Sequence, residues 1–123
     1  MQFKIKWKRA YEKVEEMDGF RVLVDRLWPR GLKKEDVKID YWAKAITPSK
    51  ELRESYHKKI IDFKSFSEKY RAELDKNTNF KEFEDTVLKE LKKRNVTLIY
   101  ASRIPELSHI PVLRKFIEEK LRK

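Results

Sequence analysis

Two short apolar runs constrain the fold of this chain more than any other feature of its sequence. Residues 20–24 read FRVLV and residues 96–100 read VTLIY. Runs of this length that are rich in β-branched side chains are typical of strands covered on both faces. Helical patterns separate the two runs, and two buried strands connected through helices predict parallel neighbours in one sheet.

Four helices are expected between and after these runs, because apolar side chains recur there every three or four residues. Residues that favour helix starts mark their beginnings, at Thr47-Pro48, at Asp62 or Ser65, at Asn79 and at Ser108. We therefore expect an α/β fold, with a small, mostly parallel sheet and helices on both faces. At this length a single three-layer domain over residues 1–123 is the simplest organisation.

Residues 2–8 (QFKIKWK) predict a further strand, because apolar residues alternate with lysines. A face of lysines could follow a phosphate backbone, but such a row more often protects an edge strand from pairing with other molecules. We favour the edge strand with one solvated face. Residues 39–46 (IDYWAKAI) are ambiguous between strand and loop.

The composition excludes several kinds of site. The chain has no cysteine, which excludes disulfides and thiolate metal sites, and it has no apolar stretch long enough to span a membrane. Two histidines far apart in sequence indicate no metal site, and two glycines are too few for a dinucleotide or phosphate loop, so we expect no cofactor. The alternating amino terminus is not a signal peptide, and we expect a cytoplasmic protein.

The net charge of +10 needs a separate explanation. Many charged residues with few glutamines and asparagines form a thermophile-like composition, which accounts for the charge density. The positive sign favours anionic partners, namely nucleic acid, nucleotides or phosphorylated metabolites. A merely solvated surface and a nucleic-acid footprint both remain open.

The motif DRLWPRG at residues 25–31 follows the first apolar run directly. Arg26 and Arg30 carry planar guanidinium groups suited to phosphate or carboxylate, and Trp28 could stack on a base or on a guanidinium. Asp25 could orient an arginine or accept a proton from a substrate. The alternative is that Asp25 and Arg26 form a structural ion pair while Trp28 fills the core.

Further candidates lie outside this motif. Ligands collect beyond the carboxyl ends of parallel strands, so Tyr100 and Ser102 are expected beside the motif as ligand-binding residues. His109 opens the last helix, where a neutral imidazole could act as a base or bond a ligand. Asp40 is a second candidate acid or base, although capping of a turn or pairing with a lysine is the better explanation.

The segment RVLVDRLWPRGLKKEDVKIDYW, together with Pro48-Ser49 and Tyr100-Ala101, resembles the YeaO-like branch of domain-of-unknown-function family 488. The resemblance extends over nearly the whole chain and implies a compact α/β domain, but no reaction. It carries over a set of motif positions, which are Asp25, Arg26, Trp28, Arg30, Asp40 and Tyr100. The chain departs from the family at Ser108, where an asparagine is usual.

Together these features predict a domain that binds a phosphate- or carboxylate-bearing ligand, such as a nucleotide, and leave open whether it also processes that ligand. Arg26 and Arg30 would hold the anion and Trp28 would form a wall of the pocket. Asp25 or Asp40 would accept a proton, and Tyr100 or His109 would donate it. A nucleic-acid-binding module that uses the basic surface is the alternative, and an adaptor for oligomerisation or partner binding is a third hypothesis; the oligomeric state is left open.

Overall fold

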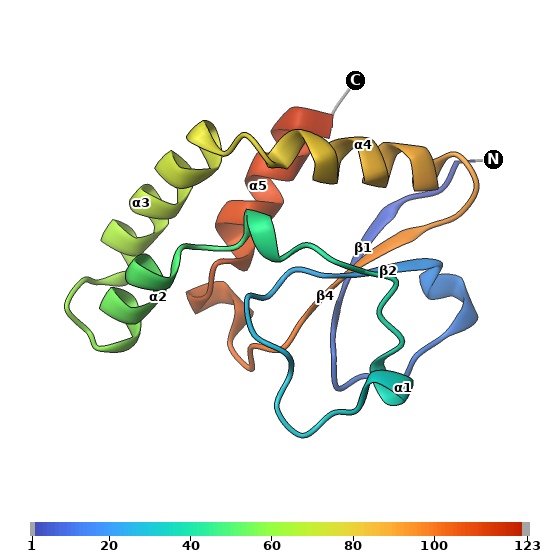
Figure 1. The fold of residues 1–123 in the computed structure, drawn as a ribbon, viewed down its shortest axis with the longest axis horizontal. Coiled ribbons are helices and arrows are strands. Elements are labelled where there is room, and N and C mark those ends of the chain that lie inside the picture. The colour runs from blue at the N-terminus through green and yellow to red at the C-terminus, as the bar shows by residue number, and fades with distance from the viewer. Residues whose placement is uncertain (1, 122–123) are drawn as a thin grey trace.

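Four parallel strands form the sheet of this protein, whose structure is a computed structural model that describes residues 2–121 (Figure 1). The strands follow the spatial order β1-β4-β2-β3, and their bounds are β1 (Ile5–Arg9), β2 (Phe20–Leu23), β3 (Tyr41–Trp42) and β4 (Val96–Tyr100). The predicted parallel pairing of the two apolar runs is confirmed, because β2 and β4 are hydrogen-bonded neighbours. The ambiguous segment at residues 39–46 forms the short strand β3 followed by a 3-10 turn at Lys44–Ile46.

The helices cover the two faces of the sheet unequally. Their bounds are α1 (Lys34–Val37), α2 (Lys50–His57), α3 (Phe63–Lys76), α4 (Phe80–Leu91) and α5 (Ile110–Leu121). The main core lies on one face, where Val22 and Leu98 of the sheet pack with side chains of α3, α4 and α5. A smaller cluster around Leu23 and Ile99 is covered by α1 and by the loop after β2. The predicted α/β fold is thus confirmed. On the face of the sheet opposite the main core, the covering helix is the single-turn helix α1.

None of the helices within residues 2–121 has the length and apolar character needed to cross a bilayer.

Strand β1 lies at an edge, as predicted, but its lysine face is not uniformly solvated. Lys8 is buried, and its Nζ atom lies 3.1 Å from Oδ1 of Asp18 and 2.9 Å from Oε1 of Glu15. Arg21 reaches the same Asp18 carboxylate, at 2.6 Å. A buried charge is tolerated only with such partners, and these partners come from outside the strand, where alternation within β1 could not reveal them.

The helix starts differ in detail from the expected ones. Ser49, and not Thr47, caps α2, because its Oγ accepts a hydrogen bond from the Leu52 N–H at 3.2 Å. Asp62, one of the two residues considered for α3, caps that helix through its side chain. Asn79 precedes α4 without a capping bond from its side chain.

The carboxyl ends of β2 and β4 lie side by side. Leu23 pairs with Ile99, and the Val24 N–H donates to the Ile99 carbonyl at 2.9 Å. The segments that follow, residues 25–31 and 101–109, therefore leave the same edge of the sheet, as the sequence predicted.

Candidate anion-binding site

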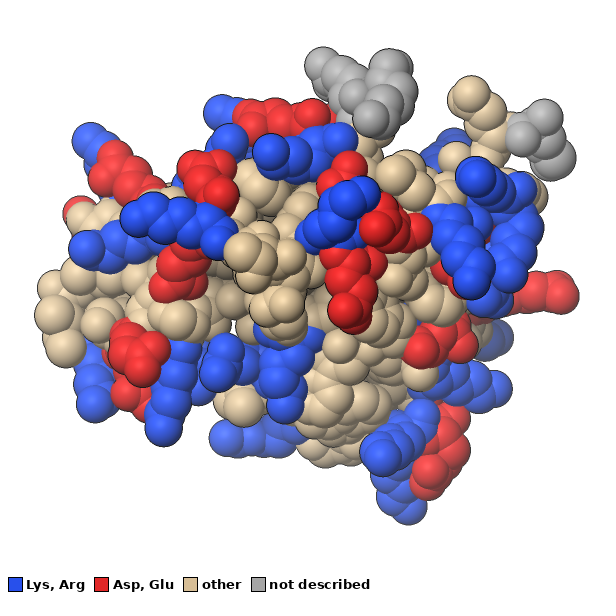
Figure 2. Space-filling model, turned by 45° about the horizontal axis from the view of Figure 1, so that its top comes forward, with Lys and Arg blue, Asp and Glu red and all other residues tan. Residues whose placement is uncertain are grey.

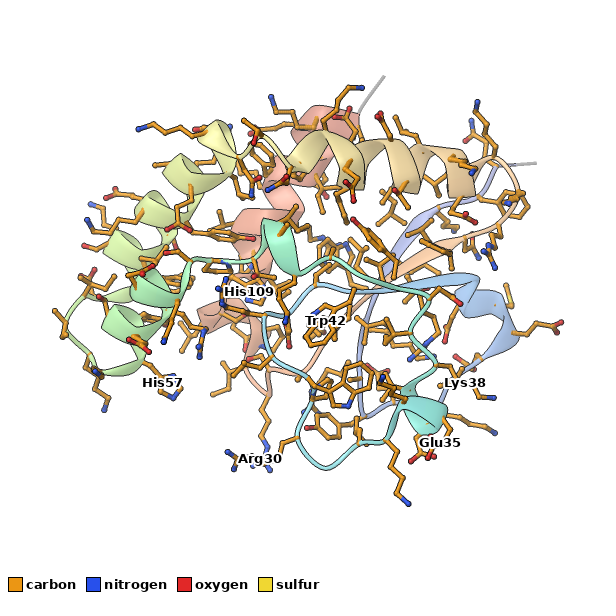
Figure 3. All side chains as sticks on the ribbon, viewed as in Figure 1. Arg30, Glu35, Lys38, Trp42, His57 and His109 are labelled. Carbon is orange, nitrogen blue, oxygen red and sulfur yellow. The ribbon has the colours of Figure 1, made fainter. Side chains whose placement is uncertain are left out.

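A cavity of about 640 Å³ opens beyond the carboxyl ends of β2 and β4. Three walls surround it: the loop after β2, the helix α2, and the segment between β4 and α5. Figure 3 labels one residue from each wall, namely Arg30, His57 and His109. The lining comprises residues 25–30, 101–104 and 107–109 together with Tyr11, Pro48, Arg53, Tyr56, His57 and Phe66. The volume lies within the range of about 300–1,000 Å³ found for small-molecule sites.

Two tyrosines connect the walls. The Tyr56 hydroxyl on α2 donates to the Leu107 carbonyl at 2.8 Å, across to the segment after β4. The Tyr11 hydroxyl donates to the Arg30 carbonyl, also at 2.8 Å, and so fixes the loop after β2. These hydrogen bonds between separate segments hold the walls at defined positions.

Most residues predicted for the site line this cavity, and two do not. The lining includes Asp25, Arg26, Trp28, Arg30, Ser102 and His109. Tyr100 packs against the main core and is not part of the lining. Burial there raises the pKa of its hydroxyl. Asp40 precedes β3 and is exposed, and its Oδ2 accepts a hydrogen bond from the backbone N–H of Arg21 at 2.9 Å.

Asp25 holds the centre of the site. Its Oδ2 accepts a hydrogen bond from the Ala101 N–H at 2.9 Å, while Oδ1 is buried without a hydrogen-bond partner, 3.4 Å from Nε2 of His109. The same Nε2 lies 2.7 Å from the Val24 carbonyl, which can only accept, so Nε2 carries a hydrogen. Burial raises the pKa of the Asp25 carboxyl, although His109 and the Ala101 N–H act in the opposite direction.

The cavity is rich in guanidinium groups. Arg26, Arg30, Arg53 and Arg103 line it, and Asp25 is the single carboxylate in the lining. Among residues 2–121 none of these four arginines forms an ion pair, so the Asp25–Arg26 pair considered as an alternative is absent. With the histidines neutral, the lining has a net charge of +3, from four guanidinium groups and one carboxylate.

Two of these arginines are poorly satisfied by the protein itself. Nη1 of Arg26 makes a long contact of 3.5 Å to the Pro48 carbonyl. Nε of Arg53 is buried and has no hydrogen-bond partner within the described structure. A buried donor that lacks an acceptor is unfavourable.

Trp28 lies both at the cavity and in the core, so each of the two interpretations of this residue is partly right. Its ring lines the cavity, yet it also packs edge-on against Trp42 at 5.7 Å between centroids, in the smaller core cluster. Its Nε1 donates to the Leu32 carbonyl, and Nε1 of Trp42 donates to the Asp25 carbonyl, each at 2.7 Å. Trp28 therefore forms a fixed wall whose polar atom is already occupied.

The α2 wall was not foreseen as part of the site. Arg53, Tyr56 and His57 follow the spacing i, i+3, i+4, which places them on one face of the helix. This spacing is visible in the sequence, but nothing in it showed that the face turns toward the motif. The amino terminus of α2 is itself occupied, because the Ser49 hydroxyl and N–H both donate to Glu73, at 2.6 and 2.9 Å.

Within residues 2–121 no group of three or more His, Cys, Asp or Glu side chains is placed to hold a metal ion.

Comparisons with known proteins identify relatives along nearly the whole chain. A family model described as "Inactive DUF488-N3 subclade" matches residues 4–123. "Uncharacterized protein YeaO" of Escherichia coli (strain K12) is 43% identical over 114 residues, which cover 92% of this chain and 96% of that protein. "Uncharacterized protein Rv3073c" of Mycobacterium tuberculosis and "Uncharacterized protein Mb3100c" of Mycobacterium bovis are each 38% identical over 115 residues, 93% of either length. No solved structure matches the chain.

Proposed function

We propose that this chain, which belongs to the family described as the inactive DUF488-N3 subclade, binds a phosphate- or carboxylate-bearing small molecule, such as a nucleotide, in its cavity without converting it. The observation that carries this proposal is the set of four arginines around the cavity, none of them paired with a carboxylate among residues 2–121. A concave surface of one charge concentrates ligands of the opposite charge, and guanidinium groups bind oxyanions through paired hydrogen bonds.

The arrangement of Asp25 supports binding without chemistry. One of its oxygens is engaged by the Ala101 N–H, and the other lies in a buried position next to His109. In this proposal Asp25 and His109 hold the cavity in shape, and Arg26 and Arg30 contact the anion. Trp28 and Ser102 form the surrounding wall.

Ligand-induced thermal stabilisation tests the proposal. The chain would first be melted with a panel of nucleotides, sugar phosphates and small carboxylates. For each compound that raises the melting temperature, the dissociation constant would be measured and the melt repeated at about a hundred times that constant. Selective binding to the folded state adds about 2.7 kcal/mol under these conditions, which raises the melting temperature by on the order of 10 °C. A panel in which no compound raises the melting temperature would contradict the proposal.

Two variants sharpen this test. Arg30→Ala removes an exposed guanidinium from the cavity and should abolish the stabilisation while the fold remains intact. Arg114→Ala is the matched control, because Arg114 is also exposed but lies outside the lining. Equal loss of stabilisation in both variants would show that general charge, and not the cavity, attracts the ligand.

Nucleic-acid binding through the basic surface remains the alternative proposal. On the face drawn in Figure 2, acidic side chains interrupt the basic ones, whereas nucleic-acid binding favours a continuous basic stripe. The two proposals differ in their response to Arg30→Ala. Nucleic-acid affinity that falls steeply with salt, and that survives Arg30→Ala with a nearly unchanged salt dependence, would favour the basic surface.

A further inference from the structure

Exposed apolar side chains gather around the cavity. Seven large hydrophobic side chains are exposed between residues 2 and 121, and four of them line this cavity: Tyr11, Leu27, Ile104 and Leu107. Leu27, Ile104 and Leu107 each expose more than half of their surface, at 60%, 53% and 51%. Apolar surface that concentrates at one place, beside polar groups, is typical of a binding site.

These side chains come from two of the walls. Leu27 lies in the loop after β2, while Ile104 and Leu107 lie in the segment between β4 and α5. The hydrogen bond from Tyr56 to the Leu107 carbonyl fixes one of these walls, and the edge-on packing of Trp28 fixes the other. A flat apolar group that enters the cavity would therefore have hydrophobic side chains of two separate segments to pack against.

Guanidinium groups line the cavity from all three walls. Arg53 is on α2, and Arg26 reaches toward Pro48, just before that helix. The Arg53 side chain lines the cavity, and its guanidinium forms no ion pair within residues 2–121. The cavity thus offers two kinds of surface: guanidinium groups, with Arg53 on α2 and Arg26 close to its start, and apolar side chains on the two loops, which also carry Arg30 and Arg103.

We propose that the ligand is amphipathic and belongs to the class of nucleoside monophosphates. Its phosphate binds Arg53 together with Arg26 and Arg30, the two arginines of the proposed function. Its base lies against Leu27, Ile104 and Leu107. This inference rests on the proposed function and names the ligand class for the same site. An inorganic phosphate or a sugar phosphate would leave most of the 640 Å³ to water and the apolar walls exposed.

Calorimetric titration of the full chain tests this inference. The ligands are ribose 5-phosphate, adenosine, and the monophosphates of adenosine, guanosine, cytidine and uridine. Covering the apolar walls adds affinity, so at least one nucleoside monophosphate should bind about tenfold or more tightly than ribose 5-phosphate. Adenosine should bind more weakly than its monophosphate, because it lacks the group that pairs with the guanidiniums.

Two variants separate the parts of the site. Leu107→Ser should weaken the nucleoside monophosphate and leave ribose 5-phosphate unchanged, and Ile60→Ser is its matched control, an exposed residue outside the lining. Arg53→Gln should weaken both phosphates and leave adenosine unchanged. Arg53→Lys retains the charge and should recover part of the binding, which keeps the test valid if Arg53→Gln is poorly folded.

The outcomes distinguish this inference from the function on which it rests. If none of the four nucleoside monophosphates binds more tightly than ribose 5-phosphate, the inference is overturned, whereas binding of ribose 5-phosphate alone would still support an anion site. If no phosphate- or carboxylate-bearing compound binds at all, both fail. Unchanged phosphate binding in a folded Arg53→Gln variant would overturn the assignment of the anion to α2.

Discussion

The carboxylate of Asp25 accepts a hydrogen bond from the backbone N–H of Ala101 at 2.9 Å, and so joins the residues that follow two neighbouring strands. Its other oxygen lies 3.4 Å from Nε2 of His109, directly before α5. One side chain thereby fixes the relative positions of the loop after β2, the segment after β4 and the start of the last helix. The shape of the cavity depends on this contact.

Replacement of Asp25 tests how much this contact stabilises the fold. Asp25→Ala leaves the Ala101 N–H without its acceptor, and we expect a loss of about 1–3 kcal/mol in the free energy of unfolding. Asp25→Asn keeps an acceptor oxygen and should lose less. Urea denaturation at neutral pH measures both variants, with the exposed Asp36→Ala as a control expected to change stability by less than about 0.5 kcal/mol. Equal losses for Asp25→Ala and Asp25→Asn would show that the hydrogen bond is not the cause.

The buried cluster around Asp18 predicts a loss of stability in acid. Burial acts to raise the pKa of Asp18, but hydrogen bonds from the Glu15 N–H and Lys8, with the charges of Lys8 and Arg21, outweigh it, so the pKa lies below the ordinary value of 3.8. A lowered pKa in the folded state means that the contribution is fully present above pH 3.8. It is lost progressively as the pH falls from there through the folded-state value.

Asp18→Asn provides the comparison. We expect this variant to be about 3 kcal/mol less stable than the parent chain at neutral pH, because it leaves buried cations with a neutral partner. Between about pH 5 and about pH 3 its free energy of unfolding should fall less steeply than that of the parent chain, as followed by urea denaturation at each pH. Parallel pH curves for the two proteins would contradict the role assigned to Asp18.

The two glycines should respond differently to alanine. Both have positive φ, at 68° for Gly19 and 81° for Gly31, so alanine is strained at either position. A Cβ at Gly19 would lie 2.1 Å from the Asn95 carbonyl oxygen, whereas a Cβ at Gly31 would have no neighbour within 4 Å. We expect Gly31→Ala to lose about 1 kcal/mol and Gly19→Ala to lose about 3 kcal/mol or more. Thermal unfolding checks which variant loses more stability. A similar melting temperature for both variants would show that the backbone near Asn95 moves aside at little cost in free energy.

The contact of Ser49 with Glu73 predicts coupling between α2 and α3. Ser49→Ala removes both the cap of α2 and the hydroxyl that donates to Glu73, and we expect a loss of about 1–2 kcal/mol. Glu73→Ala removes the acceptor from the other side. In a double-mutant cycle measured by urea denaturation the coupling should be at least about 0.5 kcal/mol. Additive losses would mean that the two residues act independently.

The sequence by itself determined the central sheet and the place of the motif. The runs at residues 20–24 and 96–100 are mostly apolar, as expected of strands covered on both faces, and this property is local. Once the strands are parallel, residues 25–31 and 101–109 must leave the same edge of the sheet. The position of Asp25, Arg26 and Arg30 beside Ser102 and His109 follows from that geometry.

Only the tertiary structure decided which other side chains meet this motif. In β4 the alternation places Tyr100 on the same face as Leu98, but it does not reveal that Tyr100 packs against the main core and stays out of the lining. Lys8 is buried because Asp18 approaches from another segment, and Arg53 lines the cavity because α2 docks beside the loops. Periodicity specifies the face of a helix or strand, whereas the partner of that face is selected by packing between segments that are distant in the chain, and no local pattern encodes that choice.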